Sequence, residues 1–267
     1  MIRDTELQNT TEPAIAYSTC YVQCGDNLEL LQSQPNESVN MIYCDILYGT
    51  GRNFGDYQDL KPIRSEIESH YLPRIIEMKR VLKQNGSIYL QMDTRINHWM
   101  RIIMDDVFGY DNFRNEIVWC YKSGGLSKTE YPKKHDVILF YSKSDKMFYN
   151  PYLVSYTEKT LQRGLTKCKG NYKLNEKGTP QIDWINDITP LLSPTCYERN
   201  GYSTQKPKEL IRRFVLASTN EGDVVADYYM GSGTTAKVCQ ELNRNFIGCD
   251  LNPKAIEITK ARLNGGQ

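Results

Sequence analysis

The stretch ADYYMGSGTTAKVCQELNRNFIGCD, residues 226–250, combines two short apolar runs with a glycine-rich turn between them. The first run ends at Asp227, and the second ends at Asp250, 23 residues further on. Gly231 and Gly233 in the turn let the backbone approach a ligand closely, and the second acid can accept hydrogen bonds from ribose hydroxyls. The stretch therefore predicts a strand–helix–strand unit that binds an adenosine-bearing cofactor.

Two cofactors fit such a unit, a nicotinamide dinucleotide and S-adenosylmethionine. The pattern Gly231-x-Gly233-x-x-Ala236 matches the dinucleotide fingerprint loosely, and a plain turn between a strand and a helix gives the same letters. Asp227 directly precedes the turn, where it would attract the ammonium and sulfonium charges of S-adenosylmethionine and repel a pyrophosphate. S-adenosylmethionine is therefore favoured, and an NAD-dependent oxidoreductase stays as an alternative that predicts NAD binding.

The rest of the chain alternates strand-like and helix-like segments, which predicts an α/β fold with a mainly parallel sheet. Further strands are expected at 21–24, 41–44, 87–93, 117–120 and 136–142, and helices at 65–86, 96–108, from Pro207 and after Pro253. The pattern Ser65-x-x-Glu68 predicts a capping box. Pro73 lies inside the first long helical pattern and predicts a kink or two abutting helices.

Regularity fades between residues 121 and 200, which predicts an insertion at an edge of the sheet. Residues 18–120 and 201–264 are expected to form one catalytic and cofactor-binding domain, with 1–17 as an N-terminal arm. From residue 122 to 177 the chain has 12 Lys and Arg against 5 Asp and Glu, although the whole chain has a net charge of only +1. Such a local excess indicates a phosphate-facing surface, and a solvated loop region is the simpler alternative.

Composition excludes several other classes of protein. The eight cysteines form no CxxC pair and only three histidines accompany them, so no metal site is expected. Free cysteines in apolar runs are typical of a reducing compartment, and neither a signal peptide nor a membrane span is visible. A cytoplasmic protein is predicted.

A second stretch, CDILYGTG at 44–51, places Asp45 after an apolar run. Together with GYSTQKP at 201–207 and GSGTT at 231–235, it resembles the amino-group DNA methyltransferases of restriction-modification systems. The resemblance is to the subgroup whose catalytic motif precedes the cofactor motif, and it covers roughly residues 18–264. It implies a Rossmann-like S-adenosylmethionine-dependent methyltransferase sheet with permuted motif order and a target-recognition region inserted at 121–200.

The chain departs from the family pattern at several prolines. Ile46 and Leu47 replace both prolines of the family's Asp-Pro-Pro-Tyr motif, Ser203 replaces a proline before Thr204, and a pair of tyrosines replaces Pro-Phe after the acid of the cofactor strand. Proline restricts the unfolded chain, so its loss makes a loop freer without removing any carbonyl. A protein that binds cofactor or DNA without turnover is therefore an alternative to an active enzyme.

The motif DILY has a chemical role that does not depend on the prolines. The lone pair of an exocyclic amine is delocalised into the base, and acceptors for both N–H groups hold it toward the methyl donor. The Asp45 carboxylate can accept one N–H and the Ile46 carbonyl the other, while Tyr48 can stack on a base taken out of the duplex. Asp at position 45 favours N6 of adenine, with N4 of cytosine as the alternative.

The resemblance also implies the remaining site residues. Cofactor contacts are expected at Asp26, Thr204, Lys206, Asp227, Gly231, Ser232, Gly233 and Asp250, and phosphate contacts at Arg52, Lys122, Lys128, Lys133 and Lys134. His135 is expected to pack or cap a strand. Double-stranded DNA is the predicted partner, and a cognate restriction endonuclease and a second copy of the chain are further candidates.

Overall fold

The computed structural model describes residues 20–55, 57–121, 126–165, 174–191, 196–202 and 204–265. The predicted arm at 1–17 and the predicted phosphate contact Lys122 lie outside these residues. Among the described residues, no helix is both long enough and apolar enough to cross a membrane.

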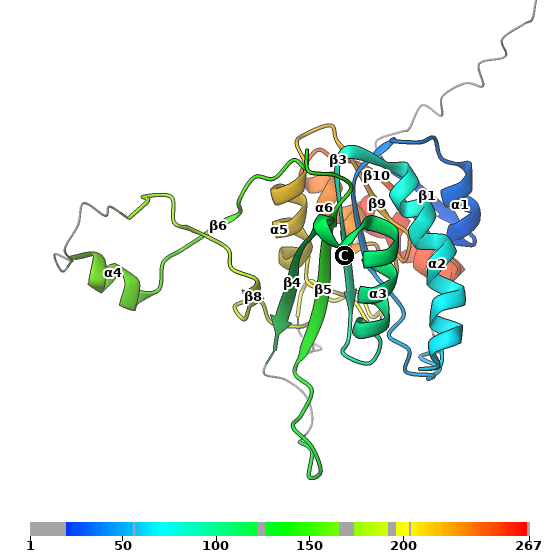
Figure 1. The fold of residues 1–267 in the computed structure, drawn as a ribbon, viewed down its shortest axis with the longest axis horizontal. Coiled ribbons are helices and arrows are strands. Elements are labelled where there is room, and N and C mark those ends of the chain that lie inside the picture. The colour runs from blue at the N-terminus through cyan, green and yellow to red at the C-terminus, as the bar shows by residue number, and fades with distance from the viewer. Residues whose placement is uncertain are drawn as a thin grey trace, which may run out of the picture.

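An eight-stranded sheet forms the centre of the molecule (Figure 1). In spatial order its strands are β1 (Cys20–Cys24), β10 (Asn245–Asp250), β9 (Val224–Asp227), β2 (Val39–Asp45), β3 (Leu82–Met92), β5 (His135–Ser142), β4 (Phe113–Cys120) and β8 (Trp184–Ile185). Neighbouring strands are parallel except that β5 is antiparallel to both β3 and β4. The predicted α/β fold with a mainly parallel sheet is confirmed.

Helices cover both faces of this sheet. One face packs against α1 (Asn27–Ser33), α2 (Arg64–Val81) and α3 (Asn97–Phe108), and the other packs against α5 (Lys208–Ser218), α6 (Thr234–Glu241) and α7 (Pro253–Leu263). In β2, Ile42 and Cys44 belong to the first apolar cluster, and Met41 and Tyr43 belong to the second. A strand buried on both faces needs an unbroken apolar run, which is what the sequence has there.

The pairing of β2 with β9 joins the two informative stretches of the sequence. Met41 pairs with Val225 and Ile42 with Ala226 in parallel register. Parallel strands present their carboxyl ends at the same edge of a sheet. Asp45 at the end of β2 and Asp227 at the end of β9 therefore reach one edge of the molecule.

Two local predictions were wrong, and one alternative of a third is excluded. The helix α2 begins at Arg64 after Ile63, which gives no side-chain cap, so Ser65 and Glu68 form no capping box; Glu68 instead pairs with Arg64 at 2.7 Å. Pro73 lies within one continuous helix, which excludes two abutting helices. That helix ends at Val81 and not at Gly86, because strand β3 already begins at Leu82.

The sheet also includes two strands from the segment 121–200, which the family resemblance assigns to target recognition. Strand β5 lies between β3 and β4 because its run HDVILFYS is apolar and almost wholly buried. The two-residue strand β8 pairs with β4. The described residues of the segment also form α4 (Glu158–Leu165) and a small sheet of β6 (Leu153–Val154) and β7 (Thr179–Pro180). The part around α4 projects away from the central sheet and its helices (Figure 1).

Candidate active site

A cavity of about 720 Å³ opens at the edge where β1, β2, β9 and β10 end. Both informative stretches line it. Among the residues proposed from the sequence, those at the cavity wall are Asp26, Asp45, Ile46, Tyr48, Arg52, Thr204, Lys206, Asp227, Gly231, Ser232 and Asp250. A volume of this size is typical of sites that hold a cofactor or a small substrate. The structure therefore brings the proposed catalytic and cofactor-binding residues to one place.

The turn after β9 is held by the two carboxylates that flank it. Asp227 accepts hydrogen bonds from the Thr235 hydroxyl at 2.6 Å and from the Tyr229 amide at 3.1 Å. Asp250 accepts from the Gly231 amide at 2.8 Å and lies at the end of the neighbouring strand. Burial raises the pKa of Asp227 to about 7, because the charged form loses its solvation there.

The two positions of the turn require glycine for different physical reasons. Both have left-handed backbone, with φ of 52° at Gly231 and 71° at Gly233. A side chain at Gly233 would overlap Thr259 of α7, so this glycine allows the turn to pack against the last helix. A side chain at Gly231 would come within 3.4 Å of the Tyr202 ring at the cavity wall. Gly231 is therefore required by its left-handed backbone, and Gly233 is required also by the close packing of the turn against α7.

Asp26 is already engaged with neighbouring groups of the chain. It caps α1 by accepting from the Leu28 amide at 2.7 Å, and it pairs with the Arg74 guanidinium of α2 at 2.8 and 3.0 Å. Arg74 also donates to the Asn27 side chain at 2.5 Å. These contacts fix the Asp26 side chain at the cavity wall, where it can present a carboxylate of set orientation to a ligand.

Asp45 lies between a lysine and a tyrosine. The Lys206 ammonium donates to its Oδ2, and the Tyr48 hydroxyl lies 2.8 Å from its Oδ1. Burial raises the pKa of Asp45, and the Lys206 charge opposes that shift. Lys206 comes from the segment 201–207, so this ion pair directly joins the catalytic and cofactor motifs.

Another acid, Asp136, contacts Tyr48 from β5 and was not foreseen from the sequence. The Tyr48 hydroxyl lies 2.9 Å from its Oδ2, which also accepts from the Gln91 amide at 2.9 Å. Tyr121 donates to its other oxygen at 3.1 Å. Asp136 is the second residue of β5, and this strand runs antiparallel to both of its neighbours. Its first residues therefore reach the same edge as the ends of the parallel strands. An acid at the start of an antiparallel strand was the signal that could have revealed it.

The loop after Tyr48 is organised by a buried acid, Asp59. Its carboxylate accepts from the Gly49 amide at 3.1 Å, and from the Thr50 amide at 2.8 Å and hydroxyl at 2.5 Å. Further along the loop the rings of Phe54 and Tyr57 stack with centroids 5.1 Å apart, and both line the cavity. The loop thus forms an aromatic wall.

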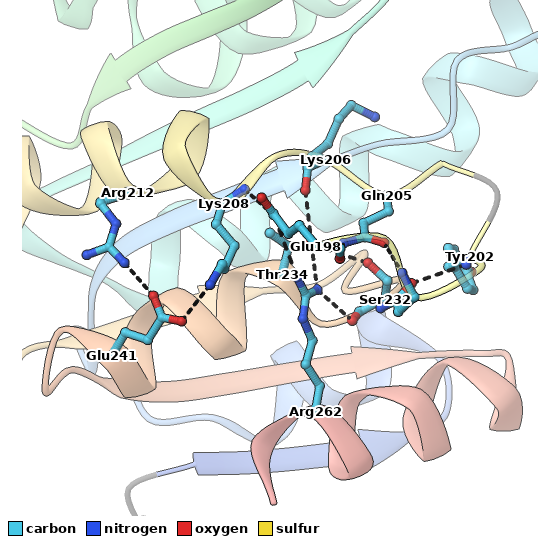
Figure 2. A network of polar contacts seen from close by, with 11 residues as sticks. Glu198, Tyr202, Gln205, Lys206, Lys208, Arg212, Ser232, Thr234, Glu241 and Arg262 are labelled. Atoms are coloured by element: carbon cyan, nitrogen blue, oxygen red, sulfur yellow. Dashed lines mark hydrogen bonds and ion pairs between the residues drawn. The ribbon is translucent and has the colours of Figure 1, made fainter. Parts of the chain in front are cut away.

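A polar network behind Lys206 holds the segment 201–207 against the glycine turn (Figure 2). Arg262 of α7 is buried and donates to the Ser232 carbonyl at 3.2 Å and to the Thr234 hydroxyl at 2.9 Å. The Thr234 hydroxyl lies 3.3 Å from the Lys206 carbonyl, and Gln205 donates to the Glu198 carbonyl at 2.7 Å. Sequence patterns gave no indication of Arg262, since its partners lie some 30 residues earlier in the chain.

The proposed phosphate contacts are spread more widely. Lys128 and Lys133 are exposed, and Lys134 is half-buried, on the segment that leads into β5. Lys133 makes a loose pair with Glu130 at 3.8 Å. Arg52 is exposed at the cavity wall. None of these lysines lines the cavity, so they belong to its surroundings.

The remaining features of the site are its side chains of metal-ligating type, His135 and the polar lining of the cavity. Within the described ranges, no cluster of three or more His, Cys, Asp and Glu side chains could hold a metal ion. His135 begins β5 and pairs with Cys120 in the ladder, as a strand residue would. The donors and acceptors of the cavity suit an adenosine and an amino-acid moiety: acids at the ends of β1, β9 and β10 and backbone amides in the turn.

The sequence matches a family described as DNA methylase, the N6 and N4 methyltransferases, over residues 39–261. The type II methyltransferase M.HpaI of Haemophilus parainfluenzae is 33% identical over 245 residues, which make up 90% of this chain and 73% of that protein. The DNA adenine methyltransferase YhdJ of Escherichia coli (strain K12) is 32% identical over 246 residues, 90% of this chain and 81% of that protein.

Solved structures with a similar fold come from the same kind of protein. The PvuII DNA methyltransferase, described as cytosine-N4-specific, aligns with a TM-score of 0.66 at 18% identity, covering 93% of this chain and 94% of that one. The complex of M1.HpyAVI with SAM aligns with a TM-score of 0.59 at 19% identity, covering 92% and 99%. The likeness extends over nearly the whole length of each chain.

Proposed function

The chain belongs to the N6/N4 DNA methylase family and is an S-adenosylmethionine-dependent DNA methyltransferase, and on that premise we propose that it methylates N6 of adenine in duplex DNA at a short specific sequence. The observation on which the proposal rests is the contact between Lys206 and Asp45. It brings the end of β2 against the segment that precedes the cofactor turn.

The cofactor residues are assigned from the cavity. The acids Asp250 and Asp26 would meet the adenosine part, and Thr204, Lys206, Asp227 and the turn at 231–233 would meet the amino-acid part. When bound, S-adenosylmethionine supplies an electrophilic methyl group on its sulfonium. Carboxylates and backbone amides around a ligand of mixed charge can satisfy its polar groups without a metal ion.

The substrate amine would be held by the end of β2. Asp45 accepts one N–H of the amino group and the Ile46 carbonyl accepts the other, so the nitrogen lone pair faces the methyl group. Tyr48 stacks on the base once it has left the duplex. Acceptors that are already in place before substrate arrives lower the barrier, because they need no reorganisation during the reaction.

Adenine is proposed over cytosine on two grounds. The acid at position 45 occupies the place that favours adenine in the family pattern. YhdJ, whose name specifies adenine, is 32% identical over most of the chain. The similarity to the PvuII enzyme, which acts on cytosine N4 by its description, is at 18% identity and bears on the fold alone.

The experiment is transfer of tritiated methyl from S-adenosylmethionine to mixed-sequence duplex DNA, followed by chromatography of the nucleosides. The proposal expects the label in N6-methyldeoxyadenosine. Label in N4-methyldeoxycytidine would overturn the choice of base and leave the enzyme class intact. Cofactor binding measured by calorimetry, with no label in DNA, would identify a binding protein that has lost turnover. Sequencing of the methylated DNA then gives the recognition site.

A further inference from the structure

A single hydroxyl group at the active site lies between two carboxylates. The Tyr48 oxygen is 2.8 Å from Asp45 Oδ1 and 2.9 Å from Asp136 Oδ2. A phenol has one hydrogen, so it can donate to only one of these acids at a time. The other acid must then be satisfied by different donors.

Asp136 is satisfied without the tyrosine. Its Oδ2 accepts from the Gln91 amide, and its Oδ1 accepts from the Tyr121 hydroxyl. The direction of the Gln91 amide is itself fixed, because Tyr43 donates to its oxygen at 2.7 Å. Asp136 and Gln91 are both buried, so their orientations are set by these contacts rather than by solvent.

Asp45 differs from Asp136, because the proposed reaction requires its oxygens as acceptors for the substrate amine. In the structure its Oδ2 accepts from Lys206 and its Oδ1 faces Tyr48. A substrate amino group needs one of these oxygens as its acceptor. If the tyrosine hydroxyl kept donating to Asp45, it would compete with the substrate for the same carboxylate.

We propose that Asp136 is a positioning residue for methyl transfer, resting on the function proposed above: it accepts the Tyr48 hydroxyl hydrogen when the substrate amine engages Asp45. The hydrogen turns from Asp45 Oδ1 to Asp136 Oδ2 while the phenol oxygen stays in place. No bond between heavy atoms changes and no net proton is moved. The Tyr48 ring therefore keeps the orientation needed for stacking, and Asp45 is free to accept from the base.

In the proposed role the Asp136 side chain acts only as a hydrogen-bond acceptor, and a neutral amide can replace it. In Asp136→Asn the amide oxygen can take the place of Oδ2 and accept from Gln91 and Tyr48, and its NH2 group can donate to the Tyr121 oxygen. In Asp136→Ala no acceptor is left. The substitution Tyr48→Phe removes the hydroxyl on which Asp136 is proposed to act.

The test is a double-mutant cycle of Asp136→Ala and Tyr48→Phe, measured as the single-turnover rate of tritiated methyl transfer to mixed-sequence duplex DNA. Loss of one hydrogen bond to a charged group is expected to lower the rate about 10- to 100-fold in Asp136→Ala. In the Tyr48→Phe background the same substitution should lower the rate by less than about threefold, since coupled residues are not additive. Asp136→Asn should stay within about threefold of the natural protein.

Asp105→Ala is the matched control. Asp105 accepts from the Tyr141 hydroxyl at 2.5 Å, and Tyr141 lies near the far end of the strand that holds Asp136, away from Tyr48. The single-turnover rate of Asp105→Ala should stay within about twofold of that of the natural protein. Cofactor affinity by calorimetry should change by less than about twofold in all Asp136 variants, because the acid is assigned to the tyrosine and not to the cofactor.

Three results would overturn the inference. These are equal losses from Asp136→Ala in both backgrounds, a loss in Asp136→Asn as large as in Asp136→Ala, or a parallel loss of cofactor affinity. If Asp136→Ala does not fold, Asp136→Ser replaces it in the cycle, because serine keeps a small polar group that is too short to reach Tyr48. If the natural protein itself transfers no methyl group to DNA, the proposed function has failed and not this role of Asp136.

Discussion

The floor of the cavity and the projecting segment 126–134 use their side chains in opposite ways. On the floor, Asp45 and Asp227 each have hydrogen-bond partners within the chain, and so does Asp136 behind Tyr48. On the segment before β5, Leu126 and Tyr131 are 96% and 97% exposed, so they contact almost nothing.

The difference separates chemistry from recognition. A reaction centre gains from groups that are fixed in advance, because the transition state then needs no rearrangement. A surface that reads another molecule must instead leave polar and aromatic groups unsatisfied until the partner arrives. We therefore expect substitutions on the floor to change rate, pH dependence and stability, and substitutions on the projecting segment to change DNA affinity.

The largest effect is expected from Asp45→Ala. Losing the acceptor for the substrate amine should lower the methyl-transfer rate about 10³-fold, as for other groups preorganised to stabilise a transition state. Cofactor affinity, measured by calorimetry, should be kept. Lys260→Ala, a substitution at an exposed lysine of α7, serves as the control and should leave the rate unchanged. Full activity in Asp45→Ala would exclude this acid from the reaction.

Asp227 and Asp187 can be compared through the pH dependence of the free energy of unfolding. Burial raises the folded-state pKa of Asp227 to about 7, from about 3.9 for an unperturbed aspartate. The folded protein then holds a proton between these values that the unfolded chain has lost, so stability should fall as pH rises through this window. Integrated from pH 5 to pH 8, this single group contributes a loss on the order of 2 kcal/mol. Urea denaturation should show that loss in the natural protein and not in Asp227→Asn.

Asp187 should show the opposite sign. It is half exposed shortly after β8, outside the cavity, and hydrogen bonds from Arg213 lower its pKa. A lowered folded pKa gives stability above the unfolded value and loses it as pH falls. The variant Asp187→Asn should therefore be less stable than the natural protein at neutral pH, and the gap should close in acid. An equal pH dependence in both variants would contradict the assignment of the two environments.

A smaller effect is expected from Lys206→Met at saturating cofactor. Burial raises the pKa of Asp45 and the Lys206 charge opposes it, so removing the lysine should raise that pKa further. The carboxylate accepts hydrogen bonds best when ionised, so activity should fall near neutral pH and recover as pH rises. Lys208→Met, which removes the neighbouring pair with Glu241, is the control and should leave the profile unshifted.

The smallest effects are expected on the projecting segment. Lys128→Gln and Lys133→Gln should each weaken DNA binding about two- to fivefold and reduce the salt dependence of binding by about one unit of slope. Fluorescence anisotropy with a mixed-sequence duplex at several salt concentrations measures both. The methyl-transfer rate at saturating DNA should not change. A loss of rate with unchanged affinity would move these lysines from recognition to the reaction.

Local patterns in the sequence predicted the part of the site that is built from local units. The strand, turn and helix from Asp227 to α6 and the apolar run before Asp45 were correct, because strand and turn chemistry is encoded over a few residues. Asp136 and Arg262 were missed. Their partners lie far away in the chain, and only the antiparallel course of β5 and the packing of α7 bring them to the cavity.

The missing prolines show the same limit. From the sequence, proline at position 46 is expected to leave activity intact or raise it, since it changes no carbonyl. In the structure the Ile46 amide donates to the Gln91 carbonyl at 3.0 Å, a bond that proline cannot make. The departure of this chain from the family pattern therefore adds a hydrogen bond to the floor as well as removing a restraint. Nothing in residues 45–48 themselves indicates that the Ile46 amide has a hydrogen-bond partner on β3.

The pairing of β2 with β9 has a consequence for how the molecule is made. The Val224 amide donates to the Asn40 side chain at 3.0 Å across a separation of 184 residues. During synthesis one edge of β2 therefore keeps its backbone N–H and C=O groups unpaired until β9 has emerged from the ribosome. Closing so long a loop is slow, and an uncovered strand edge invites association with other chains. The order of motifs along this chain thus sets a period in biosynthesis when the nascent protein is inactive and prone to aggregate.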